Sequence, residues 1–511
     1  MPTGSVDDAV TRAARIAFVF AALAVMSIAF RPASILLDKP LTEDGFYLLT
    51  VARHLAAGHG LSIDGVHPTN GIQPLFTFFA APAYWLAGGD RIAALRGVLF
   101  VHGMFFVAAA WLFGLVLRDA RSGTERLRWF GSLSWLGSGF LVLLSHNGLE
   151  TGCLLFFYLA YLRLAQRRPL AGTRSAIEHG ALLGVVVLTR IDATFFVVAA
   201  CALTVLRGTG AASQRCRDAA VVGVVAAVVS SPWWIYNEVL FGALMPTSGT
   251  AQGETLDGTA GIVASRLGAA ATNMLLVATP ELYGGDGAGH AVFLTVRGAF
   301  AALVLFVIWR LPAVPHEERR SRGDGRLAAL ALLVAGAAFL VWYPWRSWAT
   351  HFYNRYFVPL APFGLALSTI AFERVAFRVR WFGPLFVAAV VAATFAVVAI
   401  VHTGAVFRGN QWLHDQVPLV RANVPEGARL AAGQSGTLGY FVDGVHNLDG
   451  KVNAEALRHQ HDMHVYLAAN DIEWLCDWPV YLHRYVGKER LAAEWRFVDR
   501  RGEFELWRRR R

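Results

Sequence analysis

The stretch Leu41-Thr-Glu43-Asp44-Gly-Phe-Tyr47 comes shortly after the first membrane-length apolar run of the chain, which covers residues 16–30. Two adjacent carboxylates at the edge of a bilayer are costly to hold in a medium of low dielectric, so their presence needs a chemical reason. Many more apolar runs follow along the chain. A reaction at the outer surface of the membrane would supply that reason.

The composition indicates a polytopic membrane protein. Of 511 residues, 55% are hydrophobic and only 16% are charged, and a soluble chain of this composition would expose large apolar patches to water. The net charge of +10 comes mainly from short arginine clusters between apolar runs, which indicates loops on one membrane face and not a nucleic-acid groove. Four cysteines without CxxC spacing indicate neither a zinc site nor a disulfide framework: Cys153, Cys201, Cys216 and Cys476.

The arginine clusters decide the predicted topology. The stretch 72–88 is apolar, but it begins beside Asn70-Gly71 and contains Pro74 and Pro82. If it crossed the membrane, the later arginine clusters would have to be translocated, and positively charged loops resist translocation. A helix lying in the outer interface avoids this conflict. We therefore predict about eleven spans, near residues 16–30, 95–117, 129–147, 150–165, 177–190, 193–206, 218–236, 291–309, 327–345, 356–372 and 381–402.

The predicted fold is an all-α polytopic membrane protein with two extracytoplasmic parts. The first part is the loop 35–94, in which apolar residues recur at a helical period over 43–58 and predict a helix along the bilayer surface. The second is the polar segment 403–511, which predicts a small α/β domain after a membrane domain of residues 1–402. Its expected elements are helices near 411–423, 453–469 and 479–493, strands around 428–433 and 438–447, and a hairpin near 495–508. This topology places the N-terminus in the cytoplasm and the C-terminus outside, in a bacterial inner membrane.

Several polar residues of the predicted outer face have both a chemical and a structural interpretation. Glu43 and Asp44 fall in the first turn of a helix, where the macrodipole favours negative charge, so capping is an alternative to catalysis. Glu150 also stands at the start of a helix, so helix capping is again an alternative to a catalytic role. Arg190 and Asp192 interrupt an apolar stretch, so they form a buried ion pair or leave Arg190 facing an anionic ligand.

Arginines at an outer turn complete the set of candidate binding residues. Arg346 and Arg355 break the positive-inside trend, which favours phosphate binding for at least one of them. Most of the tryptophans at this level are assigned to the interfacial aromatic belt. Further candidate substrate contacts on the same face are His59, Asn70, Tyr236, Asn237 and Tyr356.

Carboxylates, arginines and aromatic or amide side chains on one face indicate one kind of chemistry. A carboxylate near a hydroxyl can act as a general base, and an arginine can neutralise a departing phosphate. Glycosyl transfer from a lipid-linked phosphosugar needs both at a membrane surface. The sequence has no Gly-rich phosphate loop and no Rossmann pattern for a soluble nucleotide sugar, which favours a donor that arrives through the bilayer.

These residues belong to short motifs that run in order through most of the chain: Glu43-Asp44-Gly-Phe-Tyr47, Ala52-Arg53-His-Leu-Ala-Ala-Gly58-His59-Gly60, Thr69-Asn70-Gly71-Ile-Gln-Pro74, Asn147-Gly-Leu-Glu150-Thr, Leu188-Thr-Arg190-Ile-Asp192, Tyr236-Asn237, Pro246-Thr-Ser-Gly249, Asn354-Arg355-Tyr356, Gly439-Tyr440 and Asn447-Leu-Asp449-Gly450. In this order the sequence resembles bacterial GT-C fold glycosyltransferases. These are the membrane enzymes related to protein O-mannosyltransferases, aminoarabinose transferases and mycobacterial arabinofuranosyltransferases.

The resemblance implies an inverting transfer of a sugar from a polyprenyl-phosphate donor to an extracytoplasmic glycan, lipid or protein. In such enzymes the first acidic position of the first loop is the expected base, usually Asp. Here Glu43 stands first and Asp44 follows, so either of the two could act. Glu150 matches the second-loop carboxylate, which would orient the acceptor or assist the base. Donors with a single phosphate generally need no metal, so we expect neither a metal nor another cofactor.

Other classes of protein share part of this pattern. A secondary transporter could also use broken helices and an intramembrane Arg–Asp pair, but it would not need a large first outer loop and a folded outer domain. A membrane-anchored sensor would not need so many spans. A lipid-linked-sugar polymerase or ligase shares the predicted chemistry and stays open. In a transferase, carboxylates 43, 44 and 150 should converge on one outward cavity, whereas a transporter site would lie at mid-membrane.

Overall fold

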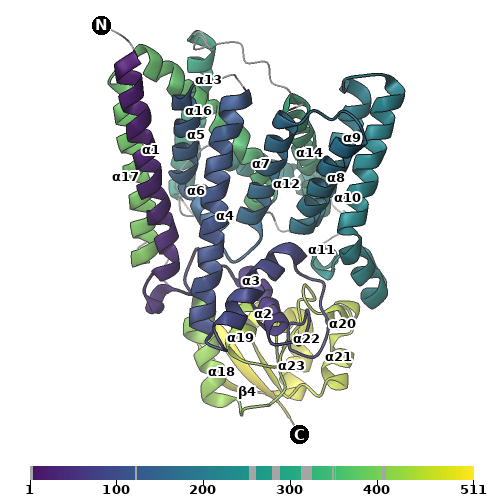
Figure 1. The fold of residues 1–511 in the computed structure, drawn as a ribbon. Helices are drawn as coiled ribbons and strands as arrows, with labels where there is room; N and C mark the ends of the chain where they lie inside the picture. Colours follow the sequence, from purple (N-terminus) through teal and green to yellow (C-terminus); the bar gives the residue numbers. More distant parts are fainter. Residues whose placement is uncertain are drawn as a thin grey trace.

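The protein consists of a helical bundle and a small α/β domain at one end of it (Figure 1). The computed structural model describes residues 4–120, 123–252, 260–278, 288–311, 325–347, 350, 353–404 and 410–510. The N-terminus lies at the end of the bundle opposite to the C-terminal domain (Figure 1). The bundle contains α1 (Gly4–Met26), α4 (Arg91–Ala120), α5 (Glu125–Leu136), α6 (Gly139–Ser145), α7 (Thr151–Arg167), α8 (Thr173–Thr189), α9 (Thr194–Arg207), α10 (Ala212–Phe241), α12 (Ala260–Ala278), α13 (Ala288–Arg310), α14 (Gly325–Arg346), α16 (Ala361–Arg378) and α17 (Phe382–Thr403).

Six helical segments of the described chain are long and apolar enough to cross a membrane, and α5 with α6, bent by 60°, forms a seventh candidate. Helices α7, α8 and α9 coincide with three further predicted spans, but they have only 17, 17 and 14 residues. About 20 residues are needed to cross a bilayer, so the total of about eleven spans stays a prediction. Residues 260–278 form α12, although no element is predicted there from the sequence. The prediction missed this helix because its many small residues weaken the apolar signal.

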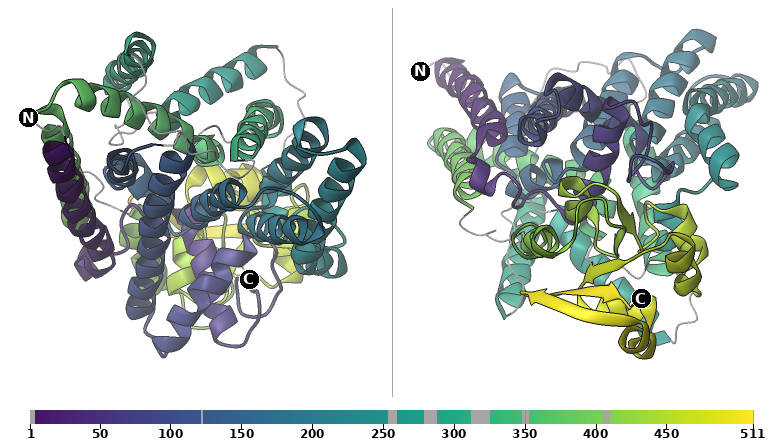
Figure 2. Two further views of the ribbon diagram at one scale, coloured as in Figure 1. Left: turned by 45° about the horizontal axis from the view of Figure 1, so that its top comes forward. Right: turned by 90° about the horizontal axis from the view of Figure 1, so that it is seen from below.

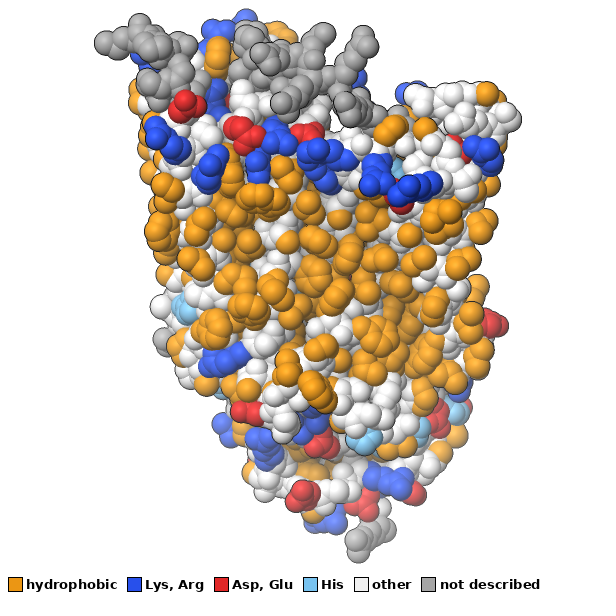
Figure 3. All heavy atoms as spheres, viewed as in Figure 1, with side chains coloured by type: hydrophobic (Ala, Val, Ile, Leu, Met, Phe, Trp, Pro, Cys, Tyr) orange, Lys and Arg blue, Asp and Glu red, His pale blue; other side chains and the backbone are white. Residues whose placement is uncertain are grey.

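Hydrophobic side chains cover the middle of the face of the bundle that Figure 3 shows, and a band of basic side chains crosses this face at the end away from the C-terminal domain. Phe20 of α1 and Val228 of α10 are 58% and 63% exposed, which is unfavourable in water and favourable in lipid. The chain is therefore an integral membrane protein. Helices α4, α7, α9, α13 and α16 each carry an arginine in the last turn, where it also complements the helix dipole: Arg118, Arg167, Arg207, Arg310 and Arg378.

The first loop forms a helical layer between the bundle and the C-terminal domain (Figures 1 and 2). After two short 3-10 helices, η1 (Ser27–Phe30) and η2 (Ala33–Ile35), it contains α2 (Glu43–Ala56) and α3 (Pro74–Leu86). Helix α3 has 13 residues, or about 20 Å of length, and cannot cross about 30 Å of hydrocarbon. This agrees with the prediction that the apolar stretch 72–88 is not a span.

The C-terminal domain is built on a five-stranded sheet of order β2-β1-β3-β5-β4. Strand β1 pairs in parallel with β2 and β3, and the antiparallel hairpin β4–β5 adds to β3. The elements are η6 (Trp412–Gln416), α18 (Val417–Asn423), β1 (Leu430–Ala432), α19 (Gly436–Phe441), β2 (Val445–Asn447), α20 (Ala454–Arg458), α21 (Met463–Ala469), β3 (Trp474–Asp477), α22 (Pro479–Val486), α23 (Lys488–Glu494), β4 (Trp495–Arg501) and β5 (Phe504–Arg509).

Two parts of the predicted C-terminal domain need correction. The strand predicted at 438–447 is wrong, because Gly436–Phe441 forms helix α19 and the strand begins only at Val445. The first amides of α19 bind a carboxylate of the distant helix α2, an interaction that local sequence does not show. The central strand β3 has no counterpart in the prediction.

Two glycines allow the C-terminal domain to approach the first loop closely. A Cβ atom on Gly436 would lie 2.2 Å from the backbone oxygen of Glu43, and one on Gly71 would lie 1.9 Å from the carbonyl oxygen of Lys451. Any larger residue at either position would have to displace backbone, which close-packed interiors resist. The C-terminal domain is therefore seated on α2 and on the Asn70-Gly71 turn by backbone contact.

The substitution Gly436→Ala should destabilise this docking by about 1–3 kcal/mol, the usual cost of forcing extra volume into a packed contact. Gly439→Ala in the same helix is the matched control, because no atom lies within 4 Å of its added Cβ. It should be neutral or stabilising by about 0.5–1 kcal/mol. Thermal unfolding and limited proteolysis of the detergent-solubilised protein measure both effects. Equal stability of the two variants would contradict the docking described here.

Candidate active site

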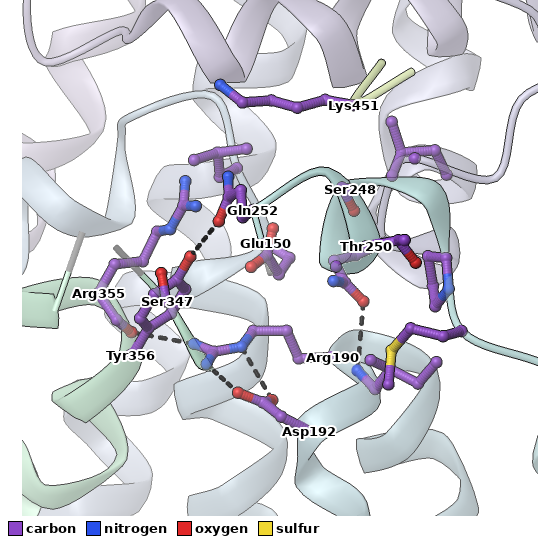
Figure 4. Close-up of a pocket in the computed structure, with 18 of the residues that line it drawn as sticks. Glu150, Arg190, Asp192, Ser248, Thr250, Gln252, Ser347, Arg355, Tyr356 and Lys451 are labelled. Atoms are coloured by element: carbon purple, nitrogen blue, oxygen red, sulfur yellow. Dashed lines mark hydrogen bonds and ion pairs between the residues drawn. The ribbon is translucent and has the colours of Figure 1, made fainter. Parts of the chain in front are cut away.

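A cavity of about 440 Å³ lies where the bundle, the first loop and the C-terminal domain meet. Its walls come from α2, the loop before α7, the 3-10 helix η3 (Ile191–Ala193), α11 (Thr247–Ala251), the end of α14 and α15 (Tyr353–Phe357). Figure 4 shows side chains from these segments around the cavity, with Lys451 reaching it from the C-terminal domain. The charged lining residues are Asp44, Glu150, Asp192, Arg190, Arg346, Arg355 and Lys451.

The start of α2 is pressed against the loop before α7. Thr42, the N-cap of α2, donates from its backbone N–H and its hydroxyl to the carbonyl oxygen of Asn147, at 3.2 and 3.1 Å. Gly45 permits this approach, since a Cβ there would lie 2.4 Å from the same oxygen. The contact brings Asp44 and Glu150 to one cavity.

The carboxylate of Asp44 pairs with two cations that line the same cavity. One carboxylate oxygen lies 3.1 Å from Nζ of Lys451, and the other lies 3.6 Å from a guanidinium nitrogen of Arg355. Burial disfavours the ammonium of Lys451, but the carboxylates of Asp44 and Asp449 outweigh burial and raise the pKa of Lys451. Lys451 is therefore a permanent cation of the cavity, and sequence reasoning did not identify it.

Glu43 points away from the cavity and binds the C-terminal domain. Its carboxylate accepts the backbone N–H of Thr437 at 3.1 and 3.0 Å, the N–H of Gly436 and the hydroxyl of Thr437. Burial raises the pKa of Glu43 to about 7, although these hydrogen bonds favour the charged form. The carboxylates 43 and 44 thus do not share one site: only Asp44 lines the cavity with Glu150.

Glu150 does not cap its helix. It stands at the N-cap position of α7, but its side chain makes no capping hydrogen bond, and its backbone is already helical. The residue is only 5% exposed. Within the described part of the chain, its carboxylate forms no ion pair or hydrogen bond with another residue. A buried carboxylate of this kind in a cavity wall is typical of a functional group.

Arg190 is paired with Asp192, as one of the two sequence interpretations expects. Its Nε donates to Asp192 at 3.0 Å, and a second nitrogen pairs with the other carboxylate oxygen. A third nitrogen donates to the backbone oxygen of Arg355 at 2.9 Å (Figure 4). Arg190 lines the cavity, and its hydrogen bond to the carbonyl oxygen of Arg355 also fixes the position of α15.

Arg346, Arg355 and Tyr356 line the same cavity. Among the described residues, Arg346 makes no hydrogen bond or ion pair, and its guanidinium lies 6.0 Å from the ring centroid of Trp342. Tyr356 stacks on Tyr343 with ring centroids 3.9 Å apart and donates its hydroxyl to Gln252 at 2.7 Å. These contacts present cations and aromatic faces toward the cavity.

The other predicted contact residues lie outside the cavity lining. His59 is exposed at the end of α2, whereas Asn70 accepts the N–H of Thr247 at 3.2 Å. Tyr236 and Asn237 donate to backbone oxygens of neighbouring loops, each at 3.0 Å. Asn70, Tyr236 and Asn237 therefore join the loops that shape the cavity.

An apolar groove of about 710 Å³ lies between α8, α9 and α10. Thr194 and Trp234 line both this groove and the polar cavity, so the groove adjoins the cavity. Among the described residues, no three His, Cys, Asp or Glu side chains are grouped so that they could hold a metal ion. The expectation that no metal is required stays a prediction.

The bundle, the helices α2 and α3 of the first loop and the α/β domain define an integral membrane protein of the GT-C fold. No protein-family model matches the chain, and no curated protein matches it by sequence. The structure of ArnT from Cupriavidus metallidurans in the apo state matches with a TM-score of 0.62 and 14% identity over 96% of this chain and 97% of that chain. ArnT bound to undecaprenyl phosphate matches with a TM-score of 0.60 and 15% identity over the same shares, 96% and 97%.

The archaeal oligosaccharyltransferase AglB from Archaeoglobus fulgidus also has this fold. Its complex with an inhibitory peptide and a dolichol-phosphate matches with a TM-score of 0.53 and 12% identity, over 91% of this chain and 69% of that chain. Identities this low establish the fold alone. The GT-C architecture implied by the sequence motifs is thereby confirmed.

The raised pKa of Glu43 makes the docking of the C-terminal domain pH-dependent. The ordinary value is 4.5 and the folded value is about 7, so protonation favours the folded state. This contribution to stability is fully present below the ordinary pKa and is lost as the pH rises through the folded pKa. Melting temperatures should therefore fall more steeply between about pH 4.5 and 7 in the parent than in Glu43→Gln. Asp477, whose pKa burial also raises to about 7, titrates in both proteins and cancels in the difference. Parallel curves would contradict this assignment.

Proposed function

We propose that the chain is an integral-membrane glycosyltransferase that moves a sugar from a polyprenyl-phosphate donor to an extracytoplasmic acceptor. The observation that carries the proposal is one cavity in which two carboxylates stand opposite several cations. A carboxylate can take the proton of an acceptor hydroxyl as the hydroxyl attacks the sugar. Cations fixed in a site of low dielectric stabilise the charge that develops on the departing phosphate.

The charge balance of the cavity suits a phosphate. Arg190 and Asp192 neutralise each other in their ion pair. The remaining lining charges are the cations Arg346, Arg355 and Lys451 and the carboxylates Asp44 and Glu150. A surplus of positive charge attracts an anion, and the guanidinium fork matches the geometry of phosphate oxygens.

Asp44 is the better candidate for the general base. It lines the cavity, whereas the carboxylate of Glu43 is occupied by the amides and hydroxyl of α19. Glu150 then orients the acceptor or assists the base from the opposite loop. The transfer inverts the anomeric centre, because the acceptor attacks the sugar directly in a single displacement.

The distribution of charge supports an outward-facing site. The arginine band lies at the end of the bundle opposite to the C-terminal domain (Figure 3), and arginine-rich loops stay in the cytoplasm. The cavity and the C-terminal domain then lie outside, with about eleven spans in a bacterial inner membrane. A transporter would instead need a site near mid-membrane, without a side chain supplied by a folded outer domain.

Two observations support a donor carried by a lipid. The similar structures contain undecaprenyl phosphate in ArnT and a dolichol-phosphate in AglB. In this chain, the apolar groove beside Thr194 and Trp234 offers a polyprenyl chain a path from the lipid to the polar cavity. Burial of an isoprenoid chain there contributes roughly 25 cal/mol per Å² of apolar surface.

The substitution Asp44→Asn should lower the turnover number roughly 10²- to 10⁴-fold, the usual contribution of a general base. Glu43→Gln should act mainly on stability, because its carboxylate does not line the cavity. Mass spectrometry of envelope glycans and glycolipids from a deletion strain identifies the product, and complementation with each variant measures its activity. Parental product levels with Asp44→Asn would remove Asp44 as the base. An unchanged glycan and lipid profile in the deletion strain would remove the proposed function.

The substitution Gly223→Trp should block the apolar groove. Gly223 lies on α10, and the nearest atom to an added Cβ is Sγ of Cys201 at 3.7 Å, so a larger side chain enters the groove. The KM for a long-chain polyprenyl donor should rise about tenfold or more, since a few displaced methylenes are each worth about 0.8 kcal/mol. A short-chain donor should be used as by the parent. Gly268→Trp on the open surface of α12 is the control. An equal KM for the long-chain donor in parent and Gly223→Trp would show that the groove is not used.

A further inference from the structure

Lys451 is held by its backbone so that its side chain enters the cavity from the C-terminal domain (Figure 4). Its N–H donates to the Asp449 carboxylate at 2.9 Å, and its carbonyl oxygen accepts the Thr247 hydroxyl at 2.8 Å. Gly71 packs against the same carbonyl at backbone distance. Three extracytoplasmic segments therefore fix the position of one lysine.

Lys451 and Arg355 each pair with a different oxygen of Asp44. Nζ of Lys451 lies 3.1 Å from Oδ1 of Asp44 and 3.5 Å from Oδ2 of Asp449, and Arg355 lies 3.6 Å from Oδ2 of Asp44. The side chains of Asp44, Arg355 and Lys451 are 14, 14 and 18% exposed, so water screens these contacts little. A carboxylate held between two cations is a weak base, because proton uptake would cost it both attractions.

We propose that Lys451 is a positioning residue that releases the base when the donor binds. This inference rests on the proposed glycosyl transfer. The donor phosphate, a stronger acceptor with more oxygens, takes Lys451 and Arg355 from Asp44. Asp44 then no longer binds these two cations and stands beside the acceptor. An empty enzyme keeps its base neutralised, and only the donor-loaded enzyme is competent for proton transfer.

Asp44 accepts the proton that the proposed transfer releases, and Lys451 and Arg355 stabilise the charge on the leaving group. The acceptor oxygen forms a bond to the anomeric carbon, and the bond between that carbon and the phosphate oxygen breaks. The bonding electron pair leaves with the phosphate, where Lys451 and Arg355 stabilise it, and the acceptor proton moves to Asp44. Because Lys451 belongs to the C-terminal domain, the donor site is complete only when that domain is docked on α2.

A lysine suits this exchange better than an arginine. Its ammonium is a compact charge with three donors on a flexible stem, so it can move from a carboxylate to a phosphate by a small rotation. The chain has 46 lysine and arginine residues in total, and its lysines are Lys39, Lys451 and Lys488. Lys488 is exposed on α23 of the same domain and provides a matched control.

Binding of undecaprenyl phosphate to the full-length protein in nanodiscs tests the inference without requiring turnover. Lys451→Met should weaken binding about tenfold or more, the scale of one charge-assisted hydrogen bond. Lys451→Arg should restore most of the affinity, and Lys488→Met should bind like the parent. Asp44→Asn should bind several-fold more tightly than the parent, because it no longer competes with the phosphate for Lys451 and Arg355.

The double variant Asp44→Asn with Lys451→Met completes a mutant cycle. The gain in affinity from Asp44→Asn should be largely lost when Lys451 is absent, so the two effects should not add. Additive effects, or parental affinity in a folded Lys451→Met protein, would overturn the role of Lys451. Weaker binding by Asp44→Asn, which keeps both cations, would also overturn it. Failure of the parent to bind undecaprenyl phosphate would instead overturn the proposed function.

Discussion

The first turn of α2 is the constraint on which the site depends. Successive residues of an α-helix point about 100° apart, so two adjacent carboxylates cannot face the same partner. Glu43 binds the first amides of α19, and Asp44 faces the cavity between Lys451 and Arg355. The same helical turn therefore binds the C-terminal domain through Glu43 and supplies the candidate general base, Asp44.

The cavity is assembled from segments that are each incomplete alone. The contact of Thr42 with Asn147 brings α2 to the loop before α7, and the glycines at 45 and 71 allow backbone to approach backbone. Buried charges are costly unless they are paired or hydrogen-bonded, so Asp44 with Lys451 and Arg355, and Arg190 with Asp192, stabilise one another in the absence of substrate. A substrate phosphate would therefore have to replace Asp44 as the partner of Lys451 and Arg355.

The predictions from the sequence agree best with the structure where a short stretch of sequence, and not a contact with a distant segment, decides the outcome. Asp44, Glu150, Arg346 and Arg355 were predicted for one site, and all four line the same cavity. Asp44 was noticed as a costly charge at the membrane edge, the two arginines as exceptions to the positive-inside trend, and Glu150 by resemblance to GT-C enzymes. Lys451 escaped prediction, because a lysine in a polar domain has no such conflict. Helix α19 was mistaken for a strand because its N-terminal amides are satisfied by a residue nearly four hundred positions away in sequence.

Hydrophobic patterning and the placement of arginine indicated the membrane class and a first loop that does not cross the membrane, since both follow from local transfer energies. The polar composition after residue 402 indicated a separate domain. The motifs that run in order along the chain indicated the GT-C fold, which the similar solved structures share. Tertiary structure decided which carboxylate lines the cavity, that Arg190 is paired with Asp192, and that the C-terminal domain supplies a cation. These outcomes depend on side-chain direction and on contacts between distant segments, and a linear pattern contains neither.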